Sequence, residues 1–177
     1  MDSNSASTYQ YQHSLHRKTR NALVTTALSL MGEKGLSQTN MIEIADRARV
    51  SRASLYNHFR DKNEVFLAVV EMEVERIVQL ALREREVATR LAIVSKEISG
   101  HRALATSVAK DPATIATLLS KHDGELWSKI YQGLASLVAS DSAGTALALR
   151  WLIGQIFIPL VPEQSDAQSW RIAEAIR

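Results

Sequence analysis

Residues 40–59, which read NMIEIADRARVSRASLYNHF, restrict the possible folds of this chain more than any other segment. In its first half, apolar residues recur at i, i+3, i+4 and i+7, the spacing of one helical face: Met41, Ile44, Ala45 and Ala48. In its second half, Leu55 and Phe59 are spaced i, i+4. Ala45 is small enough for a second helix to cross the first closely, and Val50 adds an apolar side chain between them. The segment therefore predicts two short helices joined by a tight turn.

Polar residues at suitable offsets predict where these helices begin. Asn40 precedes Glu43 by three residues, which is the spacing of a capping box. Ser51 is placed to accept hydrogen bonds from the free N–H groups at the start of the second helix. Asp61 marks the start of a longer helix, which we expect to reach Glu86.

A further helix is predicted before this pair, over residues 17–34. Its apolar residues recur at i, i+4, i+7 and i+8: Leu23, Ala27, Leu30 and Met31. Gly35 can adopt the left-handed dihedrals that end a helix. A helix followed by two short crossing helices is the helix-turn-helix arrangement, whose second helix enters the major groove of DNA. The alternative interpretation is a helical hairpin within any all-helical domain.

The residues between positions 35 and 62 follow an ordered pattern: Gly35, Thr39, Ile44, Ala45, Ala48, Val50, Ser51, Leu55, Tyr56, His58, Phe59 and Lys62. In this spacing they resemble the tetracycline-repressor (TetR) family, and the resemblance covers about residues 17–66. One position departs from the family pattern, because Arg49 stands where the turn usually has Gly. A left-handed conformation costs a non-Gly residue ~1 kcal/mol.

The resemblance implies that the second helix of the motif reads DNA bases. Arg52 can fork onto a guanine edge, and Asn57 can pair with adenine. Tyr56 and Lys62 stand at positions that in the family typically touch phosphate. The full set of candidate DNA-binding residues is Thr39, Asn40, Arg49, Ser51, Arg52, Ala53, Ser54, Tyr56, Asn57, His58 and Lys62.

The basic residues are concentrated in the same part of the chain. Residues 1–60 hold 8 Lys/Arg against 4 Asp/Glu, whereas residues 61–177 hold 13 against 15. The net charge of the whole chain is only +2, so the asymmetry suggests a polyanionic partner for the first third alone. Arg17, Lys18 and Arg20 either extend the contact with the DNA backbone or form a solvated helix face.

Composition excludes other classes of protein. The chain has no cysteine, which rules out disulfides, thiolate metal sites and cysteine catalysis. It has no Gly-rich phosphate loop and no cluster of zinc ligands, and the adjacent pair His122 and Asp123 lacks a third catalytic partner. We therefore expect no enzyme activity, no catalytic residues, no metal and no cofactor.

Seven Gly and three Pro in 177 residues leave long uninterrupted stretches, which predict an all-α fold of about nine helices. Residues 1–16 are polar and are expected to form a flexible tail. Residues 17–60 are expected to form the three-helix DNA-binding domain, and residues 61–177 a helical effector-binding and dimerisation domain. Beyond residue 86, helices are expected near 87–99, 101–110, 112–121, 124–139, 142–158 and 165–176.

A ligand pocket and a dimer face in residues 61–177 are implied by the resemblance. The candidate ligand-binding residues are Met72, His101, Arg102, His122, Trp127, Tyr131 and Trp151. The candidate dimer-interface residues are Leu149, Ile153, Gly154, Ile156, Phe157, Trp170, Ala173 and Ile176. For each of these residues taken singly, a place in the core or on the solvated surface is the alternative.

The resemblance implies a sequence-specific transcriptional regulator, a homodimeric repressor released from a palindromic operator by an unknown small molecule. The alternative is a DNA-binding protein of the same fold without ligand sensing, either an activator or a structural, nucleoid-associated protein. The expected partners are double-stranded DNA and a second copy of the chain, and the expected location is the cytoplasm. No membrane partner is expected, because the apolar stretch 143–161 contains Arg150 and Pro159.

Overall fold

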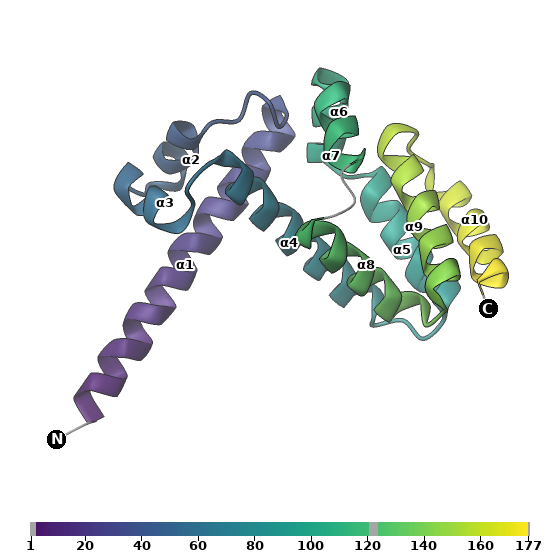
Figure 1. Ribbon diagram of the computed structural model, residues 1–177, viewed down its shortest axis with the longest axis horizontal. Helices are drawn as coiled ribbons and strands as arrows, with labels where there is room; N and C mark the ends of the chain where they lie inside the picture. Colours follow the sequence, from purple (N-terminus) through teal and green to yellow (C-terminus); the bar gives the residue numbers. More distant parts are fainter. Residues whose placement is uncertain (1–2, 121–123, 177) are drawn as a thin grey trace.

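The computed structural model describes the backbone of residues 3–120 and 124–176, and the side chains of those residues from Ser14 onward. Within these ranges the chain is entirely helical, which confirms the all-α prediction, with ten helices rather than about nine (Figure 1). The helices are α1 (Ser3–Lys34), α2 (Met41–Ala48), α3 (Arg52–His58), α4 (Lys62–Ala81), α5 (Val87–Ser99), α6 (Arg102–Lys110), α7 (Pro112–Ser120), α8 (Glu125–Val138), α9 (Ser142–Phe157) and α10 (Pro162–Ala175).

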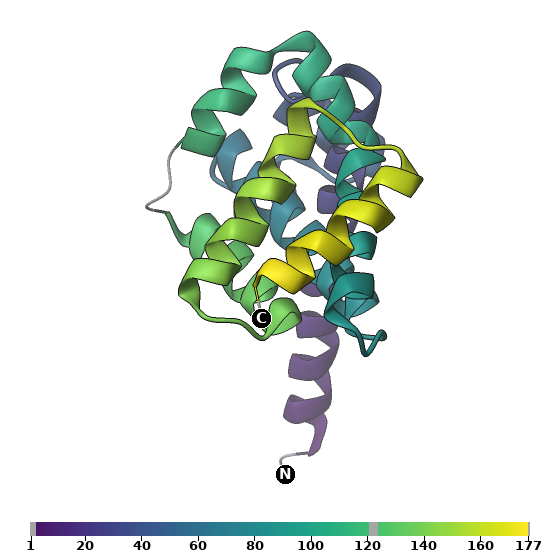
Figure 2. The same cartoon turned by 90° about the vertical axis from the view of Figure 1, so that its right-hand side faces the viewer.

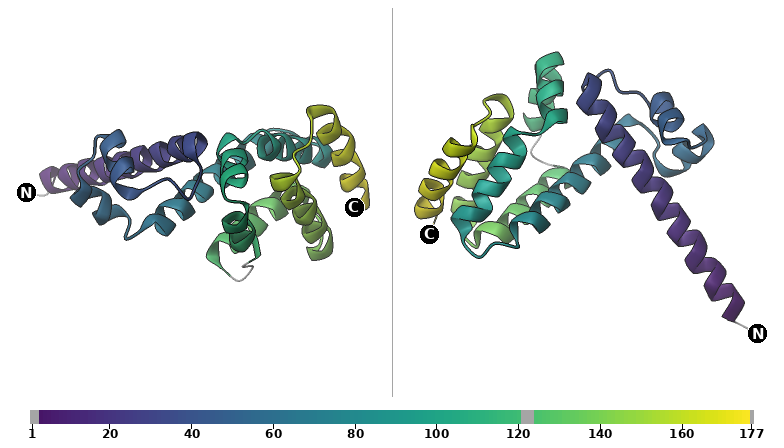
Figure 3. Two further views of the ribbon diagram at one scale, coloured as in Figure 1. Left: turned by 90° about the horizontal axis from the view of Figure 1, so that it is seen from above. Right: turned by 180° about the vertical axis from the view of Figure 1, so that it is seen from behind.

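The helices form two groups connected by α4. In Figure 1, α2 and α3 pack beside α1 on one side, and α5, α8, α9 and α10 gather on the other. Figure 3 shows from above and from behind that α4 runs from the first group into the second, where it lies beside α8. The pair α6 and α7 lies at the end of α1 near Lys34, so it contacts both groups.

The predicted capping residues begin the helices of the first group. The Glu43 N–H donates to the Asn40 side chain over 2.9 Å, and the Ser54 N–H donates to the Ser51 hydroxyl over 3.1 Å. The Asp61 carboxylate accepts from a backbone N–H of α4 in the same way. Each bond satisfies an N–H that has no partner within its helix, and the three caps together determine where the chain turns.

Two helix boundaries differ from the sequence expectation. Helix α1 begins at Ser3 rather than near Arg17, so residues 3–16 are helical rather than a tail. These residues include no Gly or Pro, and extending an existing helix is far easier than nucleating one. Helix α4 ends at Ala81 rather than Glu86, because the next residues form an exposed charged turn that leads into α5.

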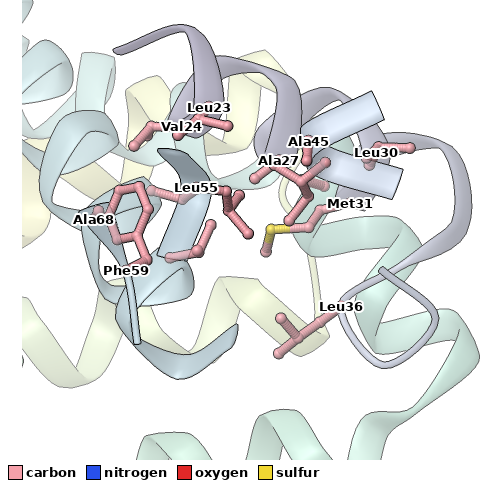
Figure 4. Packing of buried hydrophobic residues seen from close by; sticks show 14 of the residues in the cluster. Leu23, Val24, Ala27, Leu30, Met31, Leu36, Ala45, Leu55, Phe59 and Ala68 are labelled. Carbon is pink, nitrogen blue, oxygen red and sulfur yellow. The ribbon is translucent and has the colours of Figure 1, made fainter. Parts of the chain in front are cut away.

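The first of two hydrophobic cores joins α1, α2, α3 and the first half of α4. Figure 4 shows Leu23, Ala27, Leu55 and Phe59 pointing toward one another in this core. The second core joins α5, α8, α9 and α10 around buried residues such as Leu91. Figure 2 views this second group with α9 and α10 toward the reader.

None of the helices in the described part of the chain is both long enough and apolar enough to cross a membrane.

Candidate DNA-binding surface and effector cavity

The turn between α2 and α3 depends on a residue in the left-handed region. Arg49 has φ 56° and ψ 39°, and its side chain is exposed. The Val50 N–H donates to the Ala45 carbonyl over 3.0 Å, and the Arg49 N–H donates to the Asp46 carbonyl over 3.2 Å. These bonds close the end of α2 and allow a non-Gly residue at the turn, at a cost of ~1 kcal/mol.

Helix α3 has one buried face and one exposed face. Leu55 is fully buried and Phe59 is 2% exposed, so both anchor α3 in the first core. Arg52, Tyr56 and Asn57 are exposed: Asn57 lies opposite the buried pair, and Arg52 is the first residue of the helix. Ala53 and Ser51 are also exposed beside them, and Ser54 is half-buried. The packing of the core thus directs the candidate base-reading side chains outward.

The exposed cations near α3 keep their charge available. Within the described side chains, Arg17, Lys18, Arg20, Arg49 and Arg52 have no ion pair. The basic residues elsewhere in this group are neutralised instead: Arg47 pairs with Glu33 and Glu43, Lys34 with Glu43, and Arg60 with Glu64. Positive charge is therefore concentrated on the exposed side of α3 and along α1, where it would attract a polyanion.

Three of the candidate DNA-binding side chains are engaged within the protein. Thr39 is 3% exposed, and its hydroxyl donates to the Gly35 carbonyl over 2.9 Å. The Lys62 ammonium donates to the Ser37 carbonyl over 2.9 Å, and burial followed by the charge of Lys34 lowers its pKa. Asn40 is exposed, but its side chain caps α2. These contacts hold the loop between α1 and α2 against the start of α4.

His58 lies at the end of α3 against the long first helix. Its ring centroid is 4.0 Å from that of His16, and its Nδ1 is buried without a hydrogen-bond partner. Burial lowers the pKa of His58, and electrostatic interactions with His16 and Arg20 lower it further. The Arg20 guanidinium also lies 5.2 Å from the centre of the Phe59 ring. This packing connects α3 to α1 through the His58 imidazole.

A cavity of about 230 Å³ lies between the two hydrophobic cores. Side chains from α1 and from α4 to α9 line it, and three quarters of them are Leu, Ile or Val. Two of the candidate ligand-binding residues, Trp127 and His101, belong to this lining. A third, Arg102, lines a separate polar depression of about 520 Å³ that shares Glu73 and His101 with the cavity.

Glu73 is a cavity residue that the sequence did not reveal. Its Oε2 accepts from Arg76 Nη2 over 2.9 Å and lies 3.2 Å from His101 Nε2. The hydrogen bond from His101 and the adjacent Arg76 lower the pKa of Glu73 to about 2, so the carboxylate is ionised at neutral pH. Glu73 and His101 are 28 positions apart on different helices, and the only sequence signal was the i, i+3 spacing of Glu73 and Arg76 on α4.

The other candidate ligand-binding residues lie elsewhere. Met72 packs against the first core, and the Tyr131 hydroxyl donates to the Ser142 carbonyl over 3.2 Å. Trp151 packs against the second core, and its Nε1 donates to the Gln168 side chain over 2.9 Å. His122 lies outside the described residues.

The candidate dimer residues separate into three environments. Leu149, Ile153 and Ile156 line the cavity, while Ala173 and Ile176 are buried in the second core. The rest are exposed on α9 and α10, together with apolar residues that were not predicted there. The exposed residues are Gly154, Phe157 and Trp170 from the prediction, with Leu147, Ile158 and Val161 in addition.

Among the described residues, no group of three or more His, Cys, Asp or Glu side chains is arranged to hold a metal ion.

The chain resembles known proteins in the sequence of its helix-turn-helix segment and, separately, in its fold. Residues 23–69 match the family model of the bacterial regulatory proteins of the tetR family. A 66-residue segment is 36% identical to the HTH-type transcriptional regulator AcrR of Shigella flexneri, covering 37% of this chain and 31% of AcrR. The matched part thus spans less than a third of that relative.

Solved structures extend the similarity of fold to most of the chain. The TetR family repressor AlkX from Dietzia sp. strain DQ12-45-1b superimposes with a TM-score of 0.66 at 16% identity, covering 88% of this chain and 96% of AlkX. The regulator FadR from Bacillus subtilis, solved in complex with stearoyl-CoA, gives a TM-score of 0.50 at 17% identity, covering 88% of this chain and 96% of FadR. The helix-turn-helix segment thus matches the model of the tetR family of regulators, and most of the chain has the fold of the solved TetR-family structure.

Proposed function

We propose that this protein is a sequence-specific DNA-binding transcriptional regulator that acts in the cytoplasm as a homodimer. The observation that carries the proposal is the exposed face of α3. Arg52, Tyr56 and Asn57 are exposed there, while Leu55 and Phe59 are buried and anchor the helix. A rigid helix with a guanidinium and an amide on its exposed face has the chemistry needed to read guanine and adenine in the major groove.

The contacts with DNA divide into two kinds. Arg52 and Asn57 read base edges, with Ser51, Ala53 and Ser54 beside them. Arg49 and Tyr56 contact phosphates on either side of the groove, because both are exposed near the ends of the exposed face. The N-terminal end of α2, where Thr39 and Asn40 lie, approaches the backbone through its N–H groups. Lys62 and His58 support this surface mainly from within, through the contacts described above.

Two copies of the chain associate through α9 and α10. Phe157 and Trp170 are 41% and 51% exposed, and Ile158 is 76% exposed. These exposed apolar side chains, on and beside two adjacent helices, support a four-helix interface across a two-fold axis. Such a dimer presents two recognition helices about 34–36 Å apart, so the operator is palindromic.

A small molecule in the cavity releases the operator. The cavity touches α1 and α4, which also carry the DNA-binding group, so a ligand that changes their positions changes the separation of the two recognition helices. The complex of FadR with stearoyl-CoA shows that a protein of this fold binds a small molecule, which supports an effector here. A coupling of about 1–3 kcal/mol is sufficient for such control.

Selection of DNA from a random duplex pool at roughly physiological salt tests the proposal. The expected result is enrichment of an inverted repeat, with enrichment lost in Arg52→Ala and kept in Arg171→Ala, which removes an exposed charge on α10. Binding without any consensus would instead favour an architectural protein, the alternative function. No binding at any salt concentration would contradict both functions.

Dimerisation is tested separately by light scattering. A Trp170→Glu variant is expected to be monomeric and folded, because the side chain is half-exposed in one protomer. The control Leu67→Glu alters a similarly exposed apolar residue on α4 and is expected to remain dimeric. A monomeric wild-type protein at micromolar concentration would contradict the proposed interface.

A further inference from the structure

The lining of the 230 Å³ cavity restricts the chemistry of its occupant. Within the described lining, Glu73 and His101 are the only side chains with acidic or basic groups. The hydroxyl of Ser107, another lining residue, accepts from the Leu36 N–H over 2.9 Å. The remaining lining side chains are hydrocarbon, apart from the thioether of Met31 and the indole of Trp127.

Both ionisable groups already have partners. The Glu73 carboxylate is held by Arg76 Nε and Nη2 over 3.1 and 2.9 Å and by His101 Nε2 over 3.2 Å. The other ring nitrogen of His101, Nδ1, accepts from the Leu104 N–H over 3.3 Å. A charged group entering the cavity would therefore find no free counter-charge, and burying an unpaired charge is strongly unfavourable.

The volume sets the size of the occupant. An engineered apolar cavity of about 150 Å³ stays dry and binds benzene, which has six non-hydrogen atoms. In the same proportion, 230 Å³ holds about nine or ten non-hydrogen atoms.

We propose that the effector is an uncharged molecule with a hydrocarbon body of about nine or ten non-hydrogen atoms; this inference rests on the proposed function of the cavity. The rival is a charged amphiphile whose head lies in the neighbouring polar depression, beside Arg102. That depression mixes Glu33, Glu73 and Glu97 with Arg76, Lys96 and Arg102. Its acidic and basic groups offset each other, which gives a charged head little net attraction.

Calorimetry on the protein without DNA distinguishes the two ligand classes. The probes are three series of straight-chain compounds from about six to twelve carbons: primary alcohols, carboxylates and alkylammonium ions. Each methylene buried in the cavity contributes ~0.8 kcal/mol, so the affinity for alcohols is expected to rise about fourfold per carbon. The rise is expected to stop at about nine carbons, where the cavity is full.

The charged compounds of the same length are expected to bind at least about tenfold more weakly than the alcohols, because their charge stays unpaired. Tighter binding of carboxylates or alkylammonium ions than of alcohols would overturn the proposal. An affinity for alcohols that does not depend on chain length, or no binding of any alcohol, would overturn it as well.

Substitutions at Val70, a half-buried lining residue on α4, test whether the alcohols bind in this cavity. Val70→Trp fills the cavity and is expected to weaken the best alcohol at least about tenfold. Leu67→Trp is the matched control, because Leu67 lies on the same helix, is 40% exposed and does not line the cavity. Val70→Ala removes two methyl carbons and is expected to move the best chain length up by about one or two carbons.

If Val70→Trp does not fold, the change in the best-binding chain length in Val70→Ala still tests the proposal. An unchanged best chain length overturns it.

Operator release is measured in a separate experiment from ligand binding. Alcohols that bind with the expected length dependence but leave operator affinity unchanged would support this inference and contradict ligand-controlled release. Operator binding in a protein that takes up none of the alcohols would contradict this inference alone.

Discussion

The core beneath the recognition helix and the region between the two cores are packed very differently. In the first, Leu23, Leu30, Ile44 and Leu55 are all fully buried and interdigitate around Ala45. In the region between the two cores, apolar side chains of comparable size surround about 230 Å³ of unfilled space. Both regions are rich in Leu and Ile, so composition does not explain the difference.

The difference reflects what each region has to do. Base reading requires a recognition helix held in one position, and a filled core provides that rigidity. A sensor needs space for its ligand, and unfilled volume lowers stability by ~24 cal/mol per Å³. For this cavity the loss is at most about 5.5 kcal/mol, and a bound effector recovers part of it. The less stable region is thus the one that a ligand can stabilise.

The largest expected effect is on the free energy of unfolding, when one leucine in each region is replaced by alanine. Leu55→Ala should lower the free energy of unfolding by about 2–5 kcal/mol, because Leu55 is surrounded on all sides. Leu118→Ala, on the cavity wall, should cost only about 1 kcal/mol, since part of that side chain already faces empty space. Urea unfolding of both variants measures the difference. Equal losses would mean that the cavity wall is packed as tightly as the first core.

The second prediction separates DNA recognition from stability. Arg52→Ala should weaken operator binding by about 1–3 kcal/mol, because one bidentate contact with a base is lost. Its free energy of unfolding should remain within about 0.5 kcal/mol of wild type, since Arg52 is exposed and without an ion pair in the described structure. Fluorescence anisotropy with the selected operator gives the affinity. An unaltered affinity would remove Arg52 from the base-reading surface.

The third prediction concerns the polar end of the cavity. The pKa of Glu73 is about 2 in the folded protein, below its ordinary value of 4.5. This carboxylate therefore stabilises the fold above about pH 4.5, and the contribution is lost as the pH falls toward 2. Glu73→Gln should cost about 1–2 kcal/mol at pH 7, and the difference from wild type should shrink below pH 4.5.

Urea unfolding at a series of pH values between 3 and 7 measures this trend. Glu125→Gln is a suitable control, because that carboxylate is largely exposed and its loss should have little effect at any pH. A difference between wild type and Glu73→Gln that grows as the pH falls would contradict the arrangement around His101.

The smallest effect is expected at the turn before α3. Arg49→Gly should relieve a left-handed strain of ~1 kcal/mol and so raise the free energy of unfolding slightly. The same variant should bind the operator more weakly and lower the slope of log affinity against log salt by about one, because one phosphate contact is removed. Arg49→Ala keeps most of the strain while removing the charge. If both variants bind DNA as wild type does, Arg49 serves only the turn.

The regions also differ in how far the sequence predicted them. The caps at Asn40, Ser51 and Asp61 follow from neighbouring residues, and the structure contains all three. The resemblance alone placed Arg49 at the turn and left open whether the turn angle differs; the structure shows the left-handed conformation. The boundary at Ser3 was missed because the start of α1 carries no apolar periodicity. Local rules predict helices and caps well because the interacting groups are three or four positions apart.

The candidate sites were predicted unevenly for the same reason. The exposed position of Asn57 follows from the helical period once Leu55 is known to face inward, whereas Arg52 is exposed at the first residue of α3. Thr39 and Lys62 were also chosen for DNA contact, but their polar groups are used by the Gly35 and Ser37 carbonyls. The Thr39 bond spans only four positions, whereas the Lys62 bond spans 25 positions and leaves no periodic signal in the sequence.

The sequence by itself determined the helices, their caps, the helix-turn-helix segment and the side of α3 that faces outward, since each depends on residues within about two helical turns. Only the tertiary structure decided that Glu73 meets His101, and that the middle of the molecule is hollow. A cavity is the absence of atoms between helices that are far apart in the chain. Its volume depends on how those helices pack, and helical periodicity specifies which face is apolar but not how closely two such faces approach.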